Sequence, residues 1–112
     1  MKRGTIYFAD LNPTIGSEIQ KIRPVLIVSN DANNKMANTI TVVPITSNIT
    51  KVYPFEVYLD AQQTGLAKSS KAQCHQIRTI SKLRISNKQP IAKATTSILS
   101  AIEKALKLHL SL

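Results

Sequence analysis

The sequence predicts a mainly β protein: a small, strongly twisted antiparallel sheet that forms a partly closed barrel, with one C-terminal helix. Two patterns indicate this fold. Short runs of alternating or β-branched residues, separated by polar turns, extend through most of the chain. After residue 95 the apolar residues instead recur every four positions. The 112 residues suit one domain, 1–112, with one modest core.

Six segments are expected to be strands: residues 4–9, 25–28, 39–46, 55–59, 68–79 and 91–94. In the first, the alternation centres on Ile6 and Phe8. The second is a buried run that starts just past Pro24. Pro44 within the third suggests an edge position or a bulge, because proline donates no backbone hydrogen bond.

The last three strands differ in their expected burial. In 55–59, Phe55, Val57 and Leu59 alternate with the polar side chains of Glu56 and Tyr58, so this is the clearest half-buried strand. Residues 68–79 contain few apolar side chains and are expected to border a groove. Residues 91–94 form the last, short strand.

Polar segments join the strands. They comprise turns at 10–13 and 62–65, loops at 14–22 and 47–54, and a short helical turn at 81–84. Residues 31–35 are expected to form a turn or a single helical turn, with Asn30 or Asp31 as its cap. Gly16 is the expected pivot of the first loop. The C-terminal helix carries Ile98, Ile102, Leu106 and Leu110 on one face, with Thr95 or Thr96 as its N-cap. It is expected to cover the sheet and not a membrane, because its polar face is not strongly basic and it lacks an aromatic anchor.

The charge of the chain favours a polyanionic partner. Fifteen lysines and arginines against six acidic residues give a net charge of +9. Cys74 is the only cysteine, which excludes an internal disulfide and a cysteine-cluster zinc site and suits a reducing compartment. No targeting segment or membrane span is recognisable, so a cytoplasmic protein is expected.

A cation and two hydroxyls stand at the ends of neighbouring predicted strands. Arg23 precedes the second strand, while Thr46 and Ser47 end the third. Such groups can bind phosphate, although a surface arginine and two strand-capping hydroxyls would give the same pattern.

The order of several motifs resembles the MazF/PemK family, the ribonuclease toxins of bacterial toxin–antitoxin pairs. The motifs are Gly16-Ser-Glu18, Arg23-Pro24, Ser29-Asn30, Pro44-Ile-Thr46, Tyr53-Pro-Phe-Glu-Val57 and Gln76-Ile-Arg-Thr79. They extend the resemblance from Gly4 to about Arg84. It implies an SH3-like barrel that forms a homodimer and cleaves single-stranded RNA, mostly mRNA, at selected sequences without the ribosome.

Cleavage of RNA requires no cofactor, because the 2′-hydroxyl of the substrate can attack the adjacent phosphorus. His75 and His109 are too few for an obvious metal site, so no metal is expected. The resemblance implies that Arg23 is catalytic and that Thr46 donates to a phosphoryl oxygen. Glu18 matches a family glutamate of variable role; it could be a base, could orient Arg23, or could be solvated.

His75 departs from the family pattern, because relatives often have an acidic residue here, in some as part of an Arg-x-Asp pair. Histidine can serve as acid or base near neutral pH, although a structural role is the alternative. Candidate RNA contacts are Lys21, Lys51, Lys71 and Arg78 for phosphate, Tyr53 and Phe55 for stacking, and Asn12, Ser17, Ser47 and Gln76 for base edges. Core packing is an alternative role for Phe55.

The expected partners are single-stranded RNA, a second copy of the chain and an acidic antitoxin, with DNA bound only through the antitoxin complex. Two other functions are open. One is a gyrase poison with the same fold, like CcdB, but such relatives depend on a C-terminal tryptophan and this chain has none. The other is a nucleic-acid-binding barrel without activity, which the matches at Arg23, Thr46 and Glu18 disfavour.

Overall fold

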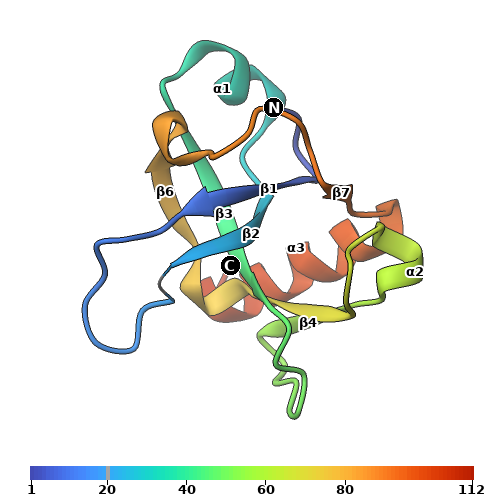
Figure 1. The fold of residues 1–112 in the computed structure, drawn as a ribbon. Coiled ribbons are helices and arrows are strands. Elements are labelled where there is room, and N and C mark those ends of the chain that lie inside the picture. Colours follow the sequence, from blue (N-terminus) through green and yellow to red (C-terminus); the bar gives the residue numbers. More distant parts are fainter. Residues whose placement is uncertain (20) are drawn as a thin grey trace.

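A computed structural model describes residues 1–19 and 21–112 (Figure 1). Its elements, in chain order, are β1 Thr5–Asp10, β2 Ile22–Ile27, α1 Asp31–Met36, β3 Thr39–Thr46, β4 Glu56–Leu59, α2 Ala61–Thr64, β5 Ser70–Gln73, the 3₁₀ turn η1 Cys74–Gln76, β6 Arg78–Ser81, the 3₁₀ turn η2 Lys82–Arg84, β7 Ala92–Lys93 and α3 Thr96–Leu110. The mainly β fold with a C-terminal helix is therefore confirmed. No helix in the described residues is both long and apolar enough to cross a membrane.

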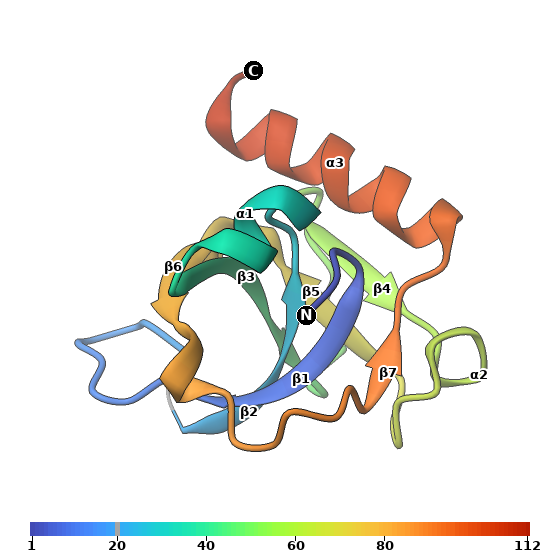
Figure 2. The same cartoon turned by 90° about the horizontal axis from the view of Figure 1, so that it is seen from above.

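The strands form one curled antiparallel sheet in the order β4-β5-β3-β2-β1-β7, and β6 pairs with the first half of β3. A bridge between Ala9 and Ile85, supported by a 3.0 Å hydrogen bond from the Ser86 N–H to the Phe8 carbonyl, joins β1 to the chain after β6. This contact completes a ring of β1, β2, β3 and β6, the curl seen in Figure 2.

Alternate side chains of the strands enter two cores, as the two-residue period of a strand requires. The barrel core includes Tyr7, Val25 and Val42, one residue from each of three neighbouring strands. The second core includes Leu26 and Val43, the next residues along β2 and β3, and packs against α3 (Figure 2). The sheet therefore buries both faces over much of its area.

Local signals explain the helices. The Asn30 side chain accepts a 2.8 Å hydrogen bond from the Asn33 N–H, and Thr95 caps α3 by accepting from the Ile98 N–H at 3.1 Å. These two expected caps are confirmed. Gly4 has a φ of +92°, and a β-carbon there would lie 3.0 Å from a Leu99 methyl of α3, so glycine allows the close approach of strand and helix.

Two predicted strand boundaries are wrong. Arg23 and Pro24, which precede the predicted strand 25–28, belong to β2 and lie opposite Ala9 and Phe8. They do so because β1 is long enough to pair with residues before the apolar run of β2. The expected strand 68–79 is interrupted by η1, so that β5 and β6 pair with different parts of β3.

Pro44 is fully buried in a central strand, so the expected edge position is wrong. It lies opposite Val25, between the part of β3 that pairs with β6, ending at Val42, and the part that pairs with β5, beginning at Ile45. Proline is tolerated here because the ladder on one side of β3 changes partner at this point.

Three side-chain placements also differ from expectation. Phe8 is 40% exposed, whereas its neighbours Tyr7 and Ala9 enter the barrel core. Glu56 is only 6% exposed, because its carboxylate has buried polar partners. Leu110 is 47% exposed, since α3 extends beyond the sheet that it covers (Figure 2).

Candidate active site at one end of the barrel

Arg23 and Thr46 lie at the same end of the barrel. Strands β2 and β3 are antiparallel, and Val25 lies opposite Pro44. Arg23 is two residues before Val25 and Thr46 is two residues after Pro44, so both side chains project from the face that carries these two residues. Both residues are partly buried. The structure therefore places the cation and the hydroxyl that the sequence singled out on one face, at the same end of two paired strands.

The loop after β1 is anchored beside this pair by residues from β6 and its flanking turns. Arg78 donates to the Leu11 carbonyl at 3.2 Å, and Gln76 accepts from the Ile19 N–H at 3.5 Å and donates to the Ser17 carbonyl at 3.3 Å. Arg84 donates to the carbonyls of Asp10 and Asn12. The Gln76 amide is therefore occupied by the loop, so its expected reading of base edges gives way to an anchoring role.

The loop displays the remaining candidates. Glu18 is exposed, as in the solvated alternative, and its carboxylate accepts a 2.6 Å hydrogen bond from the Ile15 N–H. Asn12 accepts from the Lys21 N–H at 3.2 Å, which stabilises the base of the loop. Ser17, like Lys21, is exposed and accessible to a large ligand.

A buried polar cluster lies on β4 and β5, next to Thr46. Lys71 is opposite Thr46 in β3 and Tyr58 in β4. Its amine lies 3.0 Å from the Glu56 carboxylate, and their side chains are 10% and 2% exposed. The same amine donates to the Lys51 carbonyl at 2.6 Å, while the Glu56 carboxylate accepts from the Tyr53 N–H at 3.0 Å.

Hydrogen bonding determines the ionisation of Glu56. Burial alone would raise its pKa, but the Tyr53 N–H, the Lys71 amine and the Gln73 amide together lower the pKa below its ordinary value of 4.5. Lys71, expected to contact phosphate, is instead committed to this carboxylate and to the 47–54 loop. Sequence reasoning missed the pair because its members are fifteen residues apart.

The predicted stacking residues form a row of rings that ends on α3. The rings of Tyr53 and Phe55 are stacked at 5.4 Å, Phe55 meets His75 edge-on at 4.4 Å, and His75 lies 6.4 Å from His109. Lys51 lies 4.9 Å over the Tyr53 ring. Tyr53 is 43% exposed, so its ring remains accessible to a base.

His75 is packed in this row. Burial lowers its pKa, Glu56 opposes this effect, and the nearby charges of His109 and Lys71 lower it further. Its Nδ1 is buried and has no hydrogen-bond partner within the described part of the chain. The neutral imidazole is therefore the favoured form at pH 7, which suits a base better than an acid.

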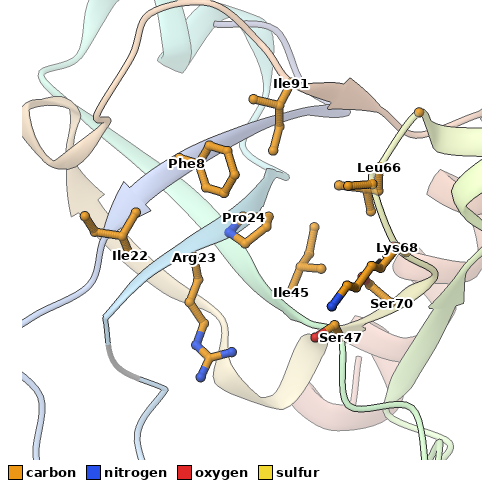
Figure 3. Close-up of a pocket in the computed structure, with 12 residues that line it drawn as sticks. Phe8, Ile22, Arg23, Pro24, Ile45, Ser47, Leu66, Lys68, Ser70 and Ile91 are labelled. Carbon is orange, nitrogen blue, oxygen red and sulfur yellow. Dashed lines mark hydrogen bonds between the residues drawn. The ribbon is translucent and has the colours of Figure 1, made fainter.

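A pocket of about 430 Å³ lies on the outer side of the barrel wall, beside Arg23 (Figure 3). Its lining is mostly apolar, with hydroxyls and a lysine at one side: Phe8, Ile22, Arg23, Pro24, Ile45, Ser47, Gly65, Leu66, Ala67, Lys68, Ser70 and Ile91. Only Arg23 and Ser47 were predicted site residues. The exposure of Phe8 depends on the pairing of distant segments, so no local pattern in the sequence could have revealed it.

Within residues 1–19 and 21–112, no group of three or more His, Cys, Asp and Glu side chains is arranged to hold a metal ion. Cys74 is buried, and burial raises the pKa of its thiol to about 12. The polar chemistry of the site therefore resides in Arg23, Thr46 and the neighbouring carboxylate, imidazole and amine groups.

Comparison with known proteins gives consistent matches. Residues 2–110 match the sequence model of the PemK-like, MazF-like toxins of type II toxin–antitoxin systems. The endoribonuclease MazF9 of Mycobacterium tuberculosis is 48% identical over 117 residues, which cover 100% of this chain and 98% of that protein. The endoribonuclease EndoA of Bacillus subtilis is 39% identical over 113 residues, with 100% and 96% covered.

Solved structures share the fold. MazF of Deinococcus radiodurans matches with a TM-score of 0.86 at 25% identity, over 100% of this chain and 97% of that chain. A mycobacterial endoribonuclease in complex with its cognate antitoxin matches with a TM-score of 0.78 at 24% identity, over 100% and 96%. By its sequence match over residues 2–110 and its identity to full-length relatives, the chain belongs to the PemK-like, MazF-like toxin family of type II toxin–antitoxin systems.

Proposed function

We propose that this protein is an endoribonuclease toxin that cuts single-stranded RNA, mostly mRNA, at selected sequences and without the ribosome. The observation that carries the proposal is the placement of Arg23 and Thr46 on one face, at the same end of two paired strands. The relatives named as endoribonucleases, at 48% and 39% identity over the whole chain, support the same activity.

The chemistry follows from the needs of the reaction. The substrate's 2′-hydroxyl attacks the adjacent phosphorus, the bond to the 5′-oxygen breaks, and a 2′,3′-cyclic phosphate and a 5′-hydroxyl result. Negative charge grows on the phosphoryl oxygens during this step. The Arg23 guanidinium can donate to two of these oxygens at once, and the Thr46 hydroxyl can donate to one. No cofactor is required in this scheme.

Two protons must move, and two residues are candidates for these transfers. Glu18 lies on the anchored loop, where its exposed carboxylate is accessible to a substrate. Burial lowers the pKa of His75, so its neutral imidazole could accept the proton of the 2′-hydroxyl. The leaving 5′-oxygen then takes its proton from the residue that has become protonated or from water. Arg23 has only the role of stabilising charge in this scheme.

The partners follow from charge and family. The protein acts as a homodimer in the cytoplasm, and an acidic antitoxin neutralises it by folding along the RNA-binding surface. A chain with a net charge of +9 would attract both RNA and an acidic segment that imitates its backbone. Lys21 and Lys51 are exposed at the loops where RNA would lie. DNA is contacted only through the antitoxin complex, and no membrane is involved.

The test is to incubate the protein with a long RNA and a matched DNA, with and without EDTA, and to map the cut ends. We expect the RNA but not the DNA to be cut, at the same rate with and without EDTA. The cut ends should be a 2′,3′-cyclic phosphate or 3′-phosphate and a 5′-hydroxyl. Arg23→Ala should slow cleavage about a hundredfold or more. Lys35→Ala, which removes an exposed charge at the end of α1, is the control. Ends bearing 5′-phosphate would contradict this mechanism.

A further inference from the structure

The pocket beside Arg23 is distinct from the face that carries Thr46. Phe8 lies opposite Pro24 in the β1–β2 pairing, so both side chains project from the same side of the sheet. Arg23 and Val25, their neighbours in β2, project from the other side. The pocket therefore lies across the barrel wall from the Arg23–Thr46 face, while Arg23 itself also lines the pocket.

The pocket has an apolar part and a polar part (Figure 3). Phe8, Pro24, Leu66 and Ile91 surround the apolar part, where Phe8 supplies a ring that is 40% exposed. At the other side the lining is polar and includes Ser47 and the exposed Lys68, while the Arg23 side chain borders the pocket and extends away from Phe8 and Pro24. Ser70 also lines this side, but it is buried and its hydroxyl donates to the Lys68 carbonyl at 2.9 Å.

This division matches the chemistry of a nucleotide. A nucleobase has apolar faces that stack on aromatic rings, polar edges that hydrogen-bond to hydroxyls, and a linked anionic phosphate. The Phe8 ring, the Ser47 hydroxyl and the Lys68 amine correspond to these three parts.

We propose that this pocket holds one nucleobase of the RNA, next to the phosphate that Arg23 contacts. Phe8 stacks on the base, and the Ser47 hydroxyl forms a hydrogen bond with its edge. Lys68 binds the flanking phosphate. The pocket is thus a determinant of the cleaved sequence at one position beside the cut. This inference rests on the proposed ribonuclease function, because the pocket adjoins Arg23, the residue proposed to contact the phosphate that is cleaved.

The first experiment maps the cut sites of the wild type, Phe8→Leu and Phe8→Ala across one long RNA of mixed sequence. We expect Phe8→Ala to cut about tenfold more slowly at the preferred sites and to lose base preference at one position next to the cut. Phe8→Leu should lie between the two. Met36→Ala, which removes an apolar side chain that is 82% exposed on α1, is the control. An unchanged motif with an unchanged rate in a folded Phe8→Ala would overturn the proposal.

A second experiment tests the pocket without cleavage. The wild-type protein, with labelled isoleucine and leucine methyls, is titrated with the four 5′-nucleoside monophosphates to concentrations on the order of 10 mM. We expect shifts in Ile22, Ile45, Leu66 and Ile91, but none in Ile40, which lies in the barrel core. If none of the four responds, the pocket does not bind a nucleotide and the proposal fails.

The two experiments separate the possible failures. If the wild type cuts no RNA but the pocket methyls respond, the proposed function fails while nucleotide binding stands. If cleavage is normal but the motif is unchanged in Phe8→Ala, the ribonuclease function stands and the pocket is not its base site. A loss of antitoxin binding in Phe8→Ala, together with that unchanged motif, would assign the pocket to the protein partner and overturn the proposal.

Discussion

Replacing either member of the buried Glu56–Lys71 pair should destabilise the protein strongly. The carboxylate and the amine are 3.0 Å apart, and their side chains are 2% and 10% exposed. Removing the lysine, as in Lys71→Met, leaves a buried carboxylate without its cation. Breaking such a pair costs about 3–5 kcal/mol, a large part of the total stability of a small domain. A loss of this size lowers the melting temperature by about 10 °C or more.

The assay is urea unfolding followed by circular dichroism, for Lys71→Met, Glu56→Gln and the double variant. We expect the double variant to lose less than the sum of the two single losses, because it leaves no unpaired buried charge. Lys104→Met, an exposed lysine on α3, is the control for the change in charge. Single losses below about 1 kcal/mol, or additive losses, would refute a stabilising role for the pair.

The pH dependence of this effect has a definite sign. The pKa of Glu56 is lower in the folded protein than its ordinary value of 4.5, so the unfolded chain binds the proton more tightly. The contribution of the Glu56 carboxylate to stability is therefore complete above pH 4.5 and is lost as the pH falls through the pKa of Glu56 in the folded protein. In Lys71→Met the carboxylate lacks its cation, so this variant should lose less stability than the wild type on acidification.

Four further outcomes are expected. Thr46→Val should slow RNA cleavage about a hundredfold and Thr46→Ser should recover most of it, as measured on one defined RNA, because only the hydroxyl acts. If His75 is the base, the wild-type cleavage rate should fall only as the pH drops below the ordinary histidine pKa of 6.5, and the rate of His75→Asn should not show this fall. A wild-type rate that rises below pH 6.5 would instead indicate that His75 is an acid. Arg78→Met should speed hydrogen exchange in the loop 12–19, and an unchanged exchange rate would mean that the bond to Leu11 does not anchor it. Light scattering should give a dimer at micromolar concentration, and a monomer would contradict the proposed assembly.

Local signals in the sequence predicted much of the fold. The caps at Asn30 and Thr95, the bounds of β3 and the C-terminal helix depend on residues within a few positions of one another. The candidate pair also depended on a local feature, because Arg23 and Thr46 stand near the ends of recognisable apolar runs. Antiparallel pairing then brought those ends together.

The features that escaped prediction depend on distant contacts. Glu56 occupies a position that alternation assigns to solvent, and only the arrival of Lys71 and Gln73 on β5 makes its burial tolerable. Phe8 occupies a position that alternation assigns to the core, yet it lies on the outer side of the barrel. Alternating hydrophobic residues identify a strand. Where both faces of the strand are covered by apolar groups, however, the alternation does not show which face points into the barrel.

The register of β2 determines both halves of the candidate site. Arg23 and Pro24 are adjacent, so their side chains point to opposite faces of the barrel wall. The pairing of Phe8 with Pro24 and of Val25 with Pro44 fixes which face each one occupies. A slip of one residue would direct the arginine toward the pocket and the proline toward Thr46. The pairing of β1 and β2 extends past the apolar run 25–28 to Arg23 and Pro24, and this has a functional consequence. It places the Arg23 charge, which is proposed to stabilise cleavage, next to the pocket that is proposed to select the base.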